Sequence, residues 1–179
     1  MSRVIYTEPL TAEGFAPFGD VLDSDGAPDQ MINQALFRRY HDRAKLDFTT
    51  GRAGISIFEA TPRALPYQLD LMERHPLGSQ AFIPMTDKPF LIIAAQDNSG
   101  APDQPRAFLS RPGQGINFHR NVWHGVLTPL HAPGLFAVID RIGEDNNLEE
   151  YTLQHTIILP IKLYQPTVGN IQQQGENHE

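Results

Sequence analysis

The sequence contains no cysteine. This absence excludes a disulfide scaffold, a zinc or iron–sulfur site with cysteine ligands, and a catalytic thiol. It is also compatible with a protein that works in a reducing compartment.

The chain has neither an excess of positive charge nor a long hydrophobic run. Its formal net charge is -7 with the seven histidines counted as neutral, so we expect no nucleic acid partner. The longest apolar run, FLIIAA at 90–95, is too short to span a bilayer, and the N-terminus shows no signal-peptide pattern. We therefore expect a soluble, cytoplasmic protein with no membrane partner.

Several catalytic motifs are missing as well. The sequence has no Gly-rich phosphate loop with a lysine, no dinucleotide fingerprint, no serine nucleophile elbow and no metalloprotease helix signature. These absences argue against nucleotide chemistry and serine hydrolysis, and we expect no nucleotide or organic cofactor.

Short apolar segments separated by turn residues dominate what remains. The stretch GISIFEA at 54–60 alternates with period two, FLIIAA at 90–95 is apolar on both faces, and LFAVIDRIG at 135–143 is another apolar strand. With 15 prolines, 14 glycines and no long helical period, the pattern predicts an all-β fold with few short helices. A closed barrel or a double-sheet jelly roll fits this pattern.

The length of 179 residues is that of one domain. We expect a single domain over residues 1–160. Residues 161–179 form a polar, Gln-rich tail that we expect to be partly disordered.

The densest cluster of polar and ring-bearing side chains is NFHRNVWHG at 117–125, which holds the only tryptophan. In a strand, Asn117 and His119 share one face, and Ile116 and Phe118 share the other. If the polar face lines a pocket, His124 could reach the same pocket after the intervening turn. The alternative is that these groups cap loops and bond to backbone, as most buried polar side chains do.

A second cluster is ERHPLGSQAF at 73–82. Glu73, His75 and Gln80 offer a carboxylate, an imidazole and an amide around a turn. Imidazole and carboxylate suit a first-row divalent metal, whereas an amide oxygen is a weaker ligand. Alternatively, Glu73 is solvated, His75 is a turn residue and Gln80 pairs with backbone.

Two further segments carry charged groups. In IDRIGEDNN at 139–147, Asp140 falls on the face of an apolar strand and is either buried with a partner or at the barrel mouth. Arg141 could clamp a substrate carboxylate or form a surface ion pair. In FRRYHDR at 37–43, Arg39 or His41 could capture an anion, or the segment could simply be solvated.

These residues carry a resemblance to the cupin superfamily. Gly113, His119, Asn121 and His124 fit its second motif in frame, and Glu73, His75 and Gln80 stand loosely where metal-binding cupins carry His, His and Glu. More specifically, the chain resembles the bacterial ureidoglycolate lyases, formerly named ureidoglycolate hydrolases. The matching stretches, spread over roughly residues 4–150, are LTAEGFAPFGDV, INQALFRRYHDRA, ERHPLGSQAFIPM, GINFHRNVWH and IDR with DNN soon after.

The resemblance implies a cupin-like jelly-roll, or double-stranded β-helix, barrel. It further implies cleavage of (S)-ureidoglycolate to glyoxylate and urea during allantoin degradation for nitrogen utilisation. It also suggests a divalent metal, with nickel as the named ion, and a homodimer formed through early segments such as INQALF and GISIF. One departure is Gly125, where many members have a second histidine.

Combining the cupin register with the alternation gives a hypothesis for the site. His119, His124 and Asn117 are expected to be catalytic, Gln80, Arg141, Asp140 and His41 to bind substrate, and His75 and His124 to be available for a metal. Two other functions stay open. One is a non-catalytic binder of a small carboxylic acid such as glyoxylate, and the other is a metal-dependent cupin isomerase or oxygenase.

Overall fold

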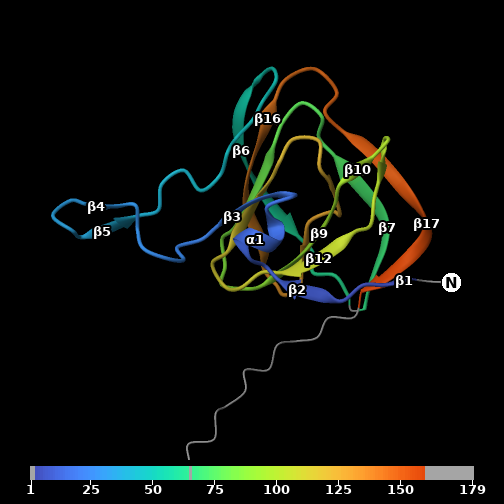
Figure 1. The fold of residues 1–179 in the computed structure, drawn as a ribbon, viewed down its shortest axis with the longest axis horizontal. Coiled ribbons are helices and arrows are strands. Elements are labelled where there is room, and N and C mark those ends of the chain that lie inside the picture. The colour runs from blue at the N-terminus through green and yellow to red at the C-terminus, as the bar shows by residue number, and fades with distance from the viewer. Residues whose placement is uncertain (1–2, 65, 160–179) are drawn as a thin grey trace, which may run out of the picture.

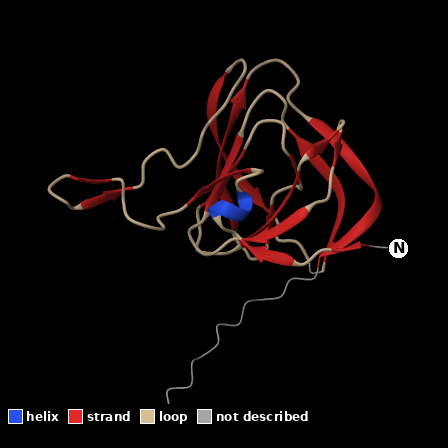
Figure 2. Ribbon diagram, in the orientation of Figure 1, coloured by secondary structure: helices blue, strands red, loops and turns tan. Residues whose placement is uncertain are grey.

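The computed structural model describes residues 3–64 and 66–159, and the predicted tail at 161–179 lies outside them. Strands make up most of this part of the chain, and its single helix is the short α1 (Ala12–Phe15) (Figure 2). The expected all-β class with few short helices is therefore confirmed. None of the described helical residues forms a segment long and apolar enough to cross a membrane.

Two large sheets form the body of the fold (Figure 1). The larger sheet has the order β1 (Arg3–Val4), β17 (Glu149–Leu159), β7 (Tyr67–Arg74), β14 (Trp123–His124), β9 (Phe90–Ala95), β12 (Arg106–Leu109) and β2 (Thr7–Pro9), and β15 (Thr128–Pro129) also pairs with β9. The smaller sheet has the order β3 (Gly19–Leu22), β13 (Gly115–Phe118), β8 (Gln80–Pro84), β16 (Gly134–Ile142) and β6 (Arg52–Ala60). Two separate hairpins are β4 (Gln30–Ile32) with β5 (Phe37–Arg39), and β10 (Asp97–Asn98) with β11 (Ala101–Pro102).

Apolar side chains from both sheets meet in the interior. Every residue of β9 is buried, as expected for a run that is apolar on both faces. The Phe15 side chain of α1 is fully buried, and its ring packs edge-on against that of Phe108. Such aromatic contacts fix the interior surface against which the polar site is built.

The register of the smaller sheet decides which side chains face this interior. Residues directly opposite each other in paired strands share a face, and the register pairs Phe118 with Gln80. It also pairs Ile139 with Ala81, so the next residue of β16, Asp140, falls opposite Gln80 on the inner face. Alternation therefore places Phe118, Gln80 and Asp140 inward, and Asn117 outward.

The outer surface of the smaller sheet stays apolar over much of its area. We call this surface the outer face; it consists of Ile55, Ile57, Ile83, Leu135, Ala137 and Ile139. Ile55 is 75% exposed and Ile57 is 60% exposed, and both lie on the long strand β6 at the edge of this sheet. An exposed apolar edge of this kind invites association with another chain.

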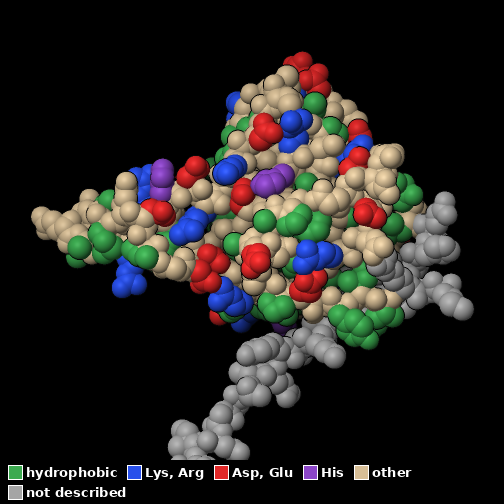
Figure 3. All heavy atoms as spheres, viewed as in Figure 1, with side chains coloured by type: hydrophobic (Ala, Val, Ile, Leu, Met, Phe, Trp, Pro, Cys, Tyr) green, Lys and Arg blue, Asp and Glu red, His purple; other side chains and the backbone are tan. Residues whose placement is uncertain are grey.

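The hairpin of β4 and β5 projects from the body of the protein, and we call residues 30–39 the arm (Figure 1). Its two strands pair only with each other. Hydrophobic side chains are exposed along it (Figure 3), among them Leu36 at 78% and Phe37 at 55%. A two-stranded ribbon is only marginally stable on its own, and among residues 3–64 and 66–159 the strands of the arm pair with no other strand, so the arm presents a second exposed apolar surface.

Candidate functional site

Five polar side chains from both sheets converge at one end of the interior. Glu73 ends β7 together with Arg74, His75 follows directly, and His124 comes from the adjacent strand β14. One potential ligand atom of each of Glu73, His75 and His124 lies within 4.8 Å of the other two. The smaller sheet adds Gln80 and Asp140, and the Gln80 side chain forms a hydrogen bond to the Asp140 carboxylate.

The tight turn between β7 and β8 explains why the sequence brings these groups together. This turn carries the chain from the larger sheet to the smaller sheet, so His75 and Gln80 approach the same space from opposite sides. Asn147 holds the turn: its Oδ1 accepts the Leu77 amide at 2.7 Å, and its carbonyl accepts from His75 Nδ1 at 2.7 Å.

Both histidines are oriented in the same way by backbone carbonyls. His75 Nδ1 lies 2.7 Å from the Asn147 carbonyl oxygen, and His124 Nδ1 lies 3.1 Å from that of Gly125. Because a carbonyl oxygen only accepts, each Nδ1 carries a proton, and in the neutral form of the ring Nε2 then presents a lone pair. Metal-ligating histidines in proteins are held in this manner.

The site also concentrates buried polar atoms that have no partner. In residues 3–64 and 66–159, six buried side-chain atoms have no hydrogen bond, and four of them lie here. Those four are His75 Nε2, His124 Nε2, Gln80 Oε1 and Asp140 Oδ1. Buried polar atoms are almost always satisfied in folded proteins, so their concentration at one place indicates a ligand-binding site.

Burial keeps the His124 ring neutral. Its desolvation, with a smaller contribution from the charge of His75, lowers the pKa of His124 to about 3. The Phe118 ring stacks on the imidazole, with centroids 4.3 Å apart and planes 8° apart. A neutral imidazole with an available Nε2 can bind a metal ion or accept a hydrogen bond from substrate at neutral pH.

This low pKa predicts a specific loss of stability in acid. Between pH 7 and pH 5 the unfolded state takes up a proton at His124, whose ordinary pKa is 6.5, while the folded state does not. Metal-free wild-type protein should therefore lose about 2 kcal/mol more unfolding free energy over this interval than His124→Gln. Urea unfolding in the presence of a chelator measures the difference.

The exposed His131 gives the matched control for this experiment. His131→Gln should show the same pH dependence as the wild type. Equal losses in wild type and His124→Gln would contradict the neutral, buried state of His124.

The two acidic groups of the site are shifted in the opposite direction. Burial raises the pKa of the Glu73 carboxyl, an effect that nearby Glu150 adds to and the charge of His75 opposes. Burial also raises the pKa of the Asp140 carboxyl, opposed by the hydrogen bond from Gln80 and the charge of His75. Carboxyls with raised pKa values are suited to proton transfer.

The donor set fits a divalent metal ion. One nitrogen of each imidazole and a Glu73 carboxylate oxygen lie within 4.8 Å of one another, and the Nε2 atoms of both rings and the amide oxygen of Gln80 are buried without a hydrogen-bond partner. This mixture of nitrogen and oxygen donors is typical of sites for first-row transition metals. The predicted metal residues His75 and His124 are thus brought together, with Glu73 as a third donor.

The structure corrects the expected placement of Asn117 and His119. Asn117 Nδ2 donates to Asp20 Oδ2 at 3.0 Å, and His119 Nε2 lies 3.2 Å from Asp20 Oδ1. As alternation along the strand predicts, Asn117 and His119 lie on the opposite strand face from Phe118. However, the apolar face that carries Phe118 points inward, and the polar face points outward. The expectation of one pocket shared by Asn117, His119 and His124 is therefore wrong, because Phe118 and not Asn117 packs on His124.

The outward side chains instead hold a segment that crosses the smaller sheet at residues 45–51. Asn117 donates to the Lys45 carbonyl at 3.2 Å, and Asp47 and Ser79 exchange backbone and side-chain hydrogen bonds. Arg141 donates from Nε to the Thr50 carbonyl at 2.8 Å. These contacts support the alternative interpretation, in which the polar side chains form structural hydrogen bonds with backbone groups.

Arg141 and His41 are also placed away from the five converging side chains. The Arg141 guanidinium is occupied by Thr50 and by Asp145, whose Oδ2 lies 2.9 Å from Nη2. The expectation that Arg141 clamps a substrate is therefore not supported, because it lies on the outward face next to the inward Asp140. His41 is exposed at the base of the arm, where its amide donates to Asp29 Oδ2 at 2.9 Å.

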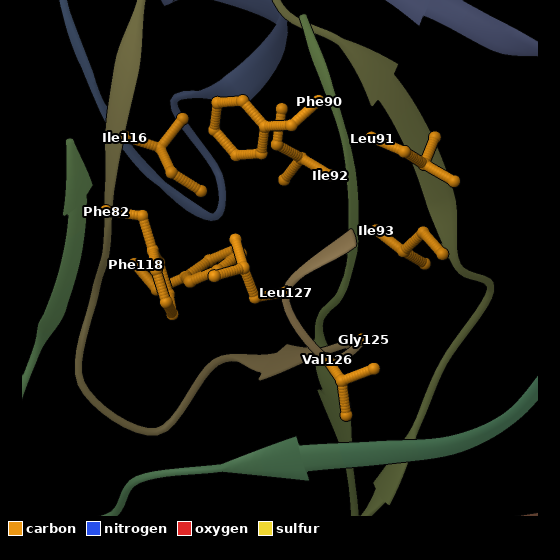
Figure 4. Close-up of a pocket in the computed structure, with 10 residues that line it drawn as sticks. All are labelled: Phe82, Phe90, Leu91, Ile92, Ile93, Ile116, Phe118, Gly125, Val126 and Leu127. Atoms are coloured by element: carbon orange, nitrogen blue, oxygen red, sulfur yellow. The ribbon is translucent and has the colours of Figure 1, made fainter. Parts of the chain in front are cut away.

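An apolar cavity adjoins the polar site (Figure 4). The Phe118 ring is common to both, since it lines the cavity and also stacks on His124. Only apolar residues surround this space, so it offers no group for acid–base chemistry. They are Phe82, Phe90, Leu91, Ile92, Ile93, Ile116, Phe118, Gly125, Val126 and Leu127.

Sequence reasoning considered the Glu73 carboxylate as a metal donor but did not include it in the final set of His75 and His124, and it gave Phe118 no role. The signal for Glu73 was its position two residues before His75, which places both at the end of one strand. For Phe118 the signal was its parity with Ile116, because an apolar pair in a central strand normally faces the core.

Comparison with known proteins adds independent information. Residues 2–160 match the sequence model of the ureidoglycolate lyase family. The chain is 60% identical over 147 residues to a protein of Rhodobacter capsulatus named ureidoglycolate lyase, covering 82% of this chain and 91% of that protein. Proteins of the same name from Chelativorans sp. and Mesorhizobium japonicum are 50% and 49% identical, with 83% and 87% of this chain and 92% and 96% of theirs covered.

Proposed function

The chain belongs to the ureidoglycolate lyase family, and from this membership we propose that it cleaves ureidoglycolate to glyoxylate and urea. The observation that carries the proposal is the group of four buried atoms without partners on His75, Gln80, His124 and Asp140. The relatives are named as lyases, which favours cleavage over a non-catalytic binder and over an isomerase or oxygenase. Allantoin degradation in the cytoplasm is the proposed setting, and cell fractionation would test the location.

The reaction needs one proton to move. The reacting carbon of ureidoglycolate carries a carboxylate, a hydroxyl group and the ureido nitrogen. As the hydroxyl loses its proton and becomes a carbonyl, the carbon–nitrogen bond breaks and its electron pair stays with nitrogen, which gains a proton. Since the proton lost by oxygen equals the one gained by nitrogen, a single positioned acid–base group suffices.

Asp140 is the group we assign to this transfer. Its Oδ1 is buried without a partner, and burial raises the pKa of its carboxyl, which suits the group to taking up a proton and returning it. Gln80 donates to the same carboxylate and fixes its orientation. The Gln80 Oε1 atom remains available to accept from a ureido N–H group.

Glu73, His75 and His124 would hold a divalent ion, for which we propose nickel. When bound, such an ion supplies Lewis-acid polarisation of substrate oxygens. The residues themselves contribute orientation and exclusion of water, because His124 is fully buried and Phe118 covers one side of its ring.

The test is a product assay with purified protein and racemic ureidoglycolate. Glyoxylate, urea and ammonia are followed together, with and without chelator and added nickel. Glyoxylate and urea formed in equal amounts, well above the spontaneous rate, is the expected result. Ammonia in place of urea would make the protein an amide-cleaving hydrolase and would overturn the lyase assignment.

We further propose that two copies form a homodimer through the outer face and the arm. Both surfaces are apolar and exposed, and in a two-fold pair the arm of each copy can cover the outer face of the other. The early segments named from the sequence, INQALF and GISIF, fall within the arm and β6 respectively.

A single charge on the outer face should disrupt this pairing. Ile57→Lys places an ammonium group where burial is proposed, so the protein should elute as a monomer in size-exclusion chromatography with light scattering. Val4→Lys is the matched control, because Val4 is 49% exposed but lies in the larger sheet, and it should remain dimeric. A dimeric Ile57→Lys protein would exclude the outer face as the interface.

A further inference from the structure

The strand that carries His124 has few backbone contacts to hold it against β7. β14 consists of two residues, and within residues 3–64 and 66–159 it pairs with β7 through the single residue pair His124–Glu73. On its other side it pairs with Ala94 and Ala95 of β9. One residue pair specifies the register of β14 against β7 only weakly, so side-chain contacts must help to determine how Glu73 and His124 meet.

Such side-chain contacts lie on the other face of the larger sheet. Successive residues of a strand point to opposite faces, so Arg74 and Trp123 occupy the face opposite to Glu73 and His124. The Trp123 side chain is buried there in a hydrophobic cluster. The Arg74 guanidinium lies over its indole ring, with Cζ 4.4 Å from the ring centroid. This cation–π contact joins β7 directly to β14.

Two carboxylates hold the Arg74 guanidinium in this position. Asp97 Oδ1 accepts from Arg74 Nη1 at 2.7 Å and from Trp123 Nε1 at 2.9 Å. Glu149 Oε2 accepts from Arg74 Nε at 2.7 Å and lies 2.6 Å from Nη2. The Asp97 carboxylate is itself held by the Gly100 amide, which lies 3.2 Å from Oδ1. We call Arg74, Asp97, Trp123 and Glu149 the Arg74 cluster; it connects β7, β10, β14 and β17.

The geometry of the Arg74 cluster restricts position more than it adds stability. Ion pairs near a protein surface contribute little to the free energy of unfolding. However, the Arg74 side chain is only 13% exposed, and it donates to two carboxylates while it stacks on a ring. Hydrogen bonds from a planar guanidinium specify direction as well as distance. The cluster therefore limits how β14 can lie against β7.

We propose that Arg74 is a positioning residue that keeps Glu73 and His124 in the relative position at which they hold a divalent ion. The inference rests on the metal site of the proposed function. Arg74 directly follows Glu73, and Trp123 directly precedes His124, so a displacement of the Arg74–Trp123 contact moves both ligands. The only tryptophan of the chain thereby has a role, because its ring is the surface against which Arg74 stacks.

Arg74→Lys tests the inference, and Arg106→Lys is the matched control. Arg106 belongs to the same sheet, donates two hydrogen bonds to Glu8, and lies over the Phe108 ring with Cζ 4.9 Å from its centroid. Its strand, β12, pairs with β9 and β2 and not with β7 or β14. Both substitutions keep the positive charge and remove the planar guanidinium, so both should lower the midpoint of urea unfolding.

Nickel affinity should separate the two variants. In calorimetric titrations of chelator-treated full-length proteins, Arg74→Lys should bind nickel about 10-fold or more weakly than the wild type, the loss typical when a group that orients a metal ligand is changed. Arg106→Lys should bind it with wild-type affinity. Asp97→Asn keeps an oxygen acceptor for the indole N–H group but loses the negative charge, so its loss should be intermediate. The fluorescence of Trp123 should shift in Arg74→Lys and not in Arg106→Lys.

Three results would overturn the inference. They are a wild-type nickel affinity in Arg74→Lys, equal losses of affinity in Arg74→Lys and Arg106→Lys, and a wild-type protein that binds no nickel. Equal losses would mean that affinity follows stability and not position. Failure of the proposed function gives a different pattern, in which the wild type binds nickel and Arg74→Lys binds it more weakly, but neither cleaves ureidoglycolate.

Discussion

Replacing Asp140 by asparagine should lower kcat for ureidoglycolate about 1000-fold, within the range found for general acid–base groups. The substitution keeps the shape of the side chain and its contact with Gln80, but it removes the group that accepts the hydroxyl proton. Because burial raises the pKa of the Asp140 carboxyl, the wild-type rate should also fall on the acid side at a pH above the ordinary range of an aspartate. Steady-state and single-turnover kinetics across pH measure both effects.

Asp20→Asn is the matched control for this prediction. Asp20 is a carboxylate on the outward side of the sheet, hydrogen-bonded to Asn117 and to the Lys45 amide. Its substitution should weaken the hold on the crossing segment and change kcat only slightly. A near-wild-type kcat in Asp140→Asn would exclude Asp140 from the chemistry. A large loss of kcat in Asp20→Asn alone would instead indicate that the catalytic groups lie on the outward face of the sheet.

The sequence was sufficient for the fold class because strand periodicity is a local property. The alternation at 54–60 and the doubly apolar run at 90–95 both became strands, β6 and β9. The alternation of Asn117 and His119 against Ile116 and Phe118 was also correct. Alternation alone does not determine which face meets the core, and here the aromatic face is inward because its burial releases more free energy than burial of an amide.

The site was partly predictable for the same reason. His75, Gln80 and His124 were singled out by their spacing, and Asp140 by sharing a strand face with Val138, an inward residue of β16 that is fully buried. The contacts of Arg141 with Thr50 and Asp145 could not be predicted, because these partners come from loops whose positions depend on tertiary packing. Likewise, nothing in the local pattern shows that residues 45–51 cross the sheet and occupy its outward polar groups.

Metal binding should depend strongly on the two inward histidines and not on the outward one. Chelator-treated wild-type protein should bind one nickel ion per chain, and His75→Gln and His124→Gln should each weaken binding by about 100-fold or more. The reason is that a ring nitrogen of each histidine lies within 4.8 Å of the other and of a Glu73 carboxylate oxygen, and that both Nε2 atoms are buried without a hydrogen-bond partner. Isothermal titration calorimetry measures the affinities without relying on activity.

His119→Gln provides the contrast, because His119 contacts Asp20 on the other side of the sheet. Its nickel affinity should equal that of the wild type. Loss of binding in His119→Gln together with retention in His75→Gln would place the metal on the outward face. If only the inward variants lose the ion, the interior between the two sheets holds the metal, and His124 acts there while His119 serves the fold.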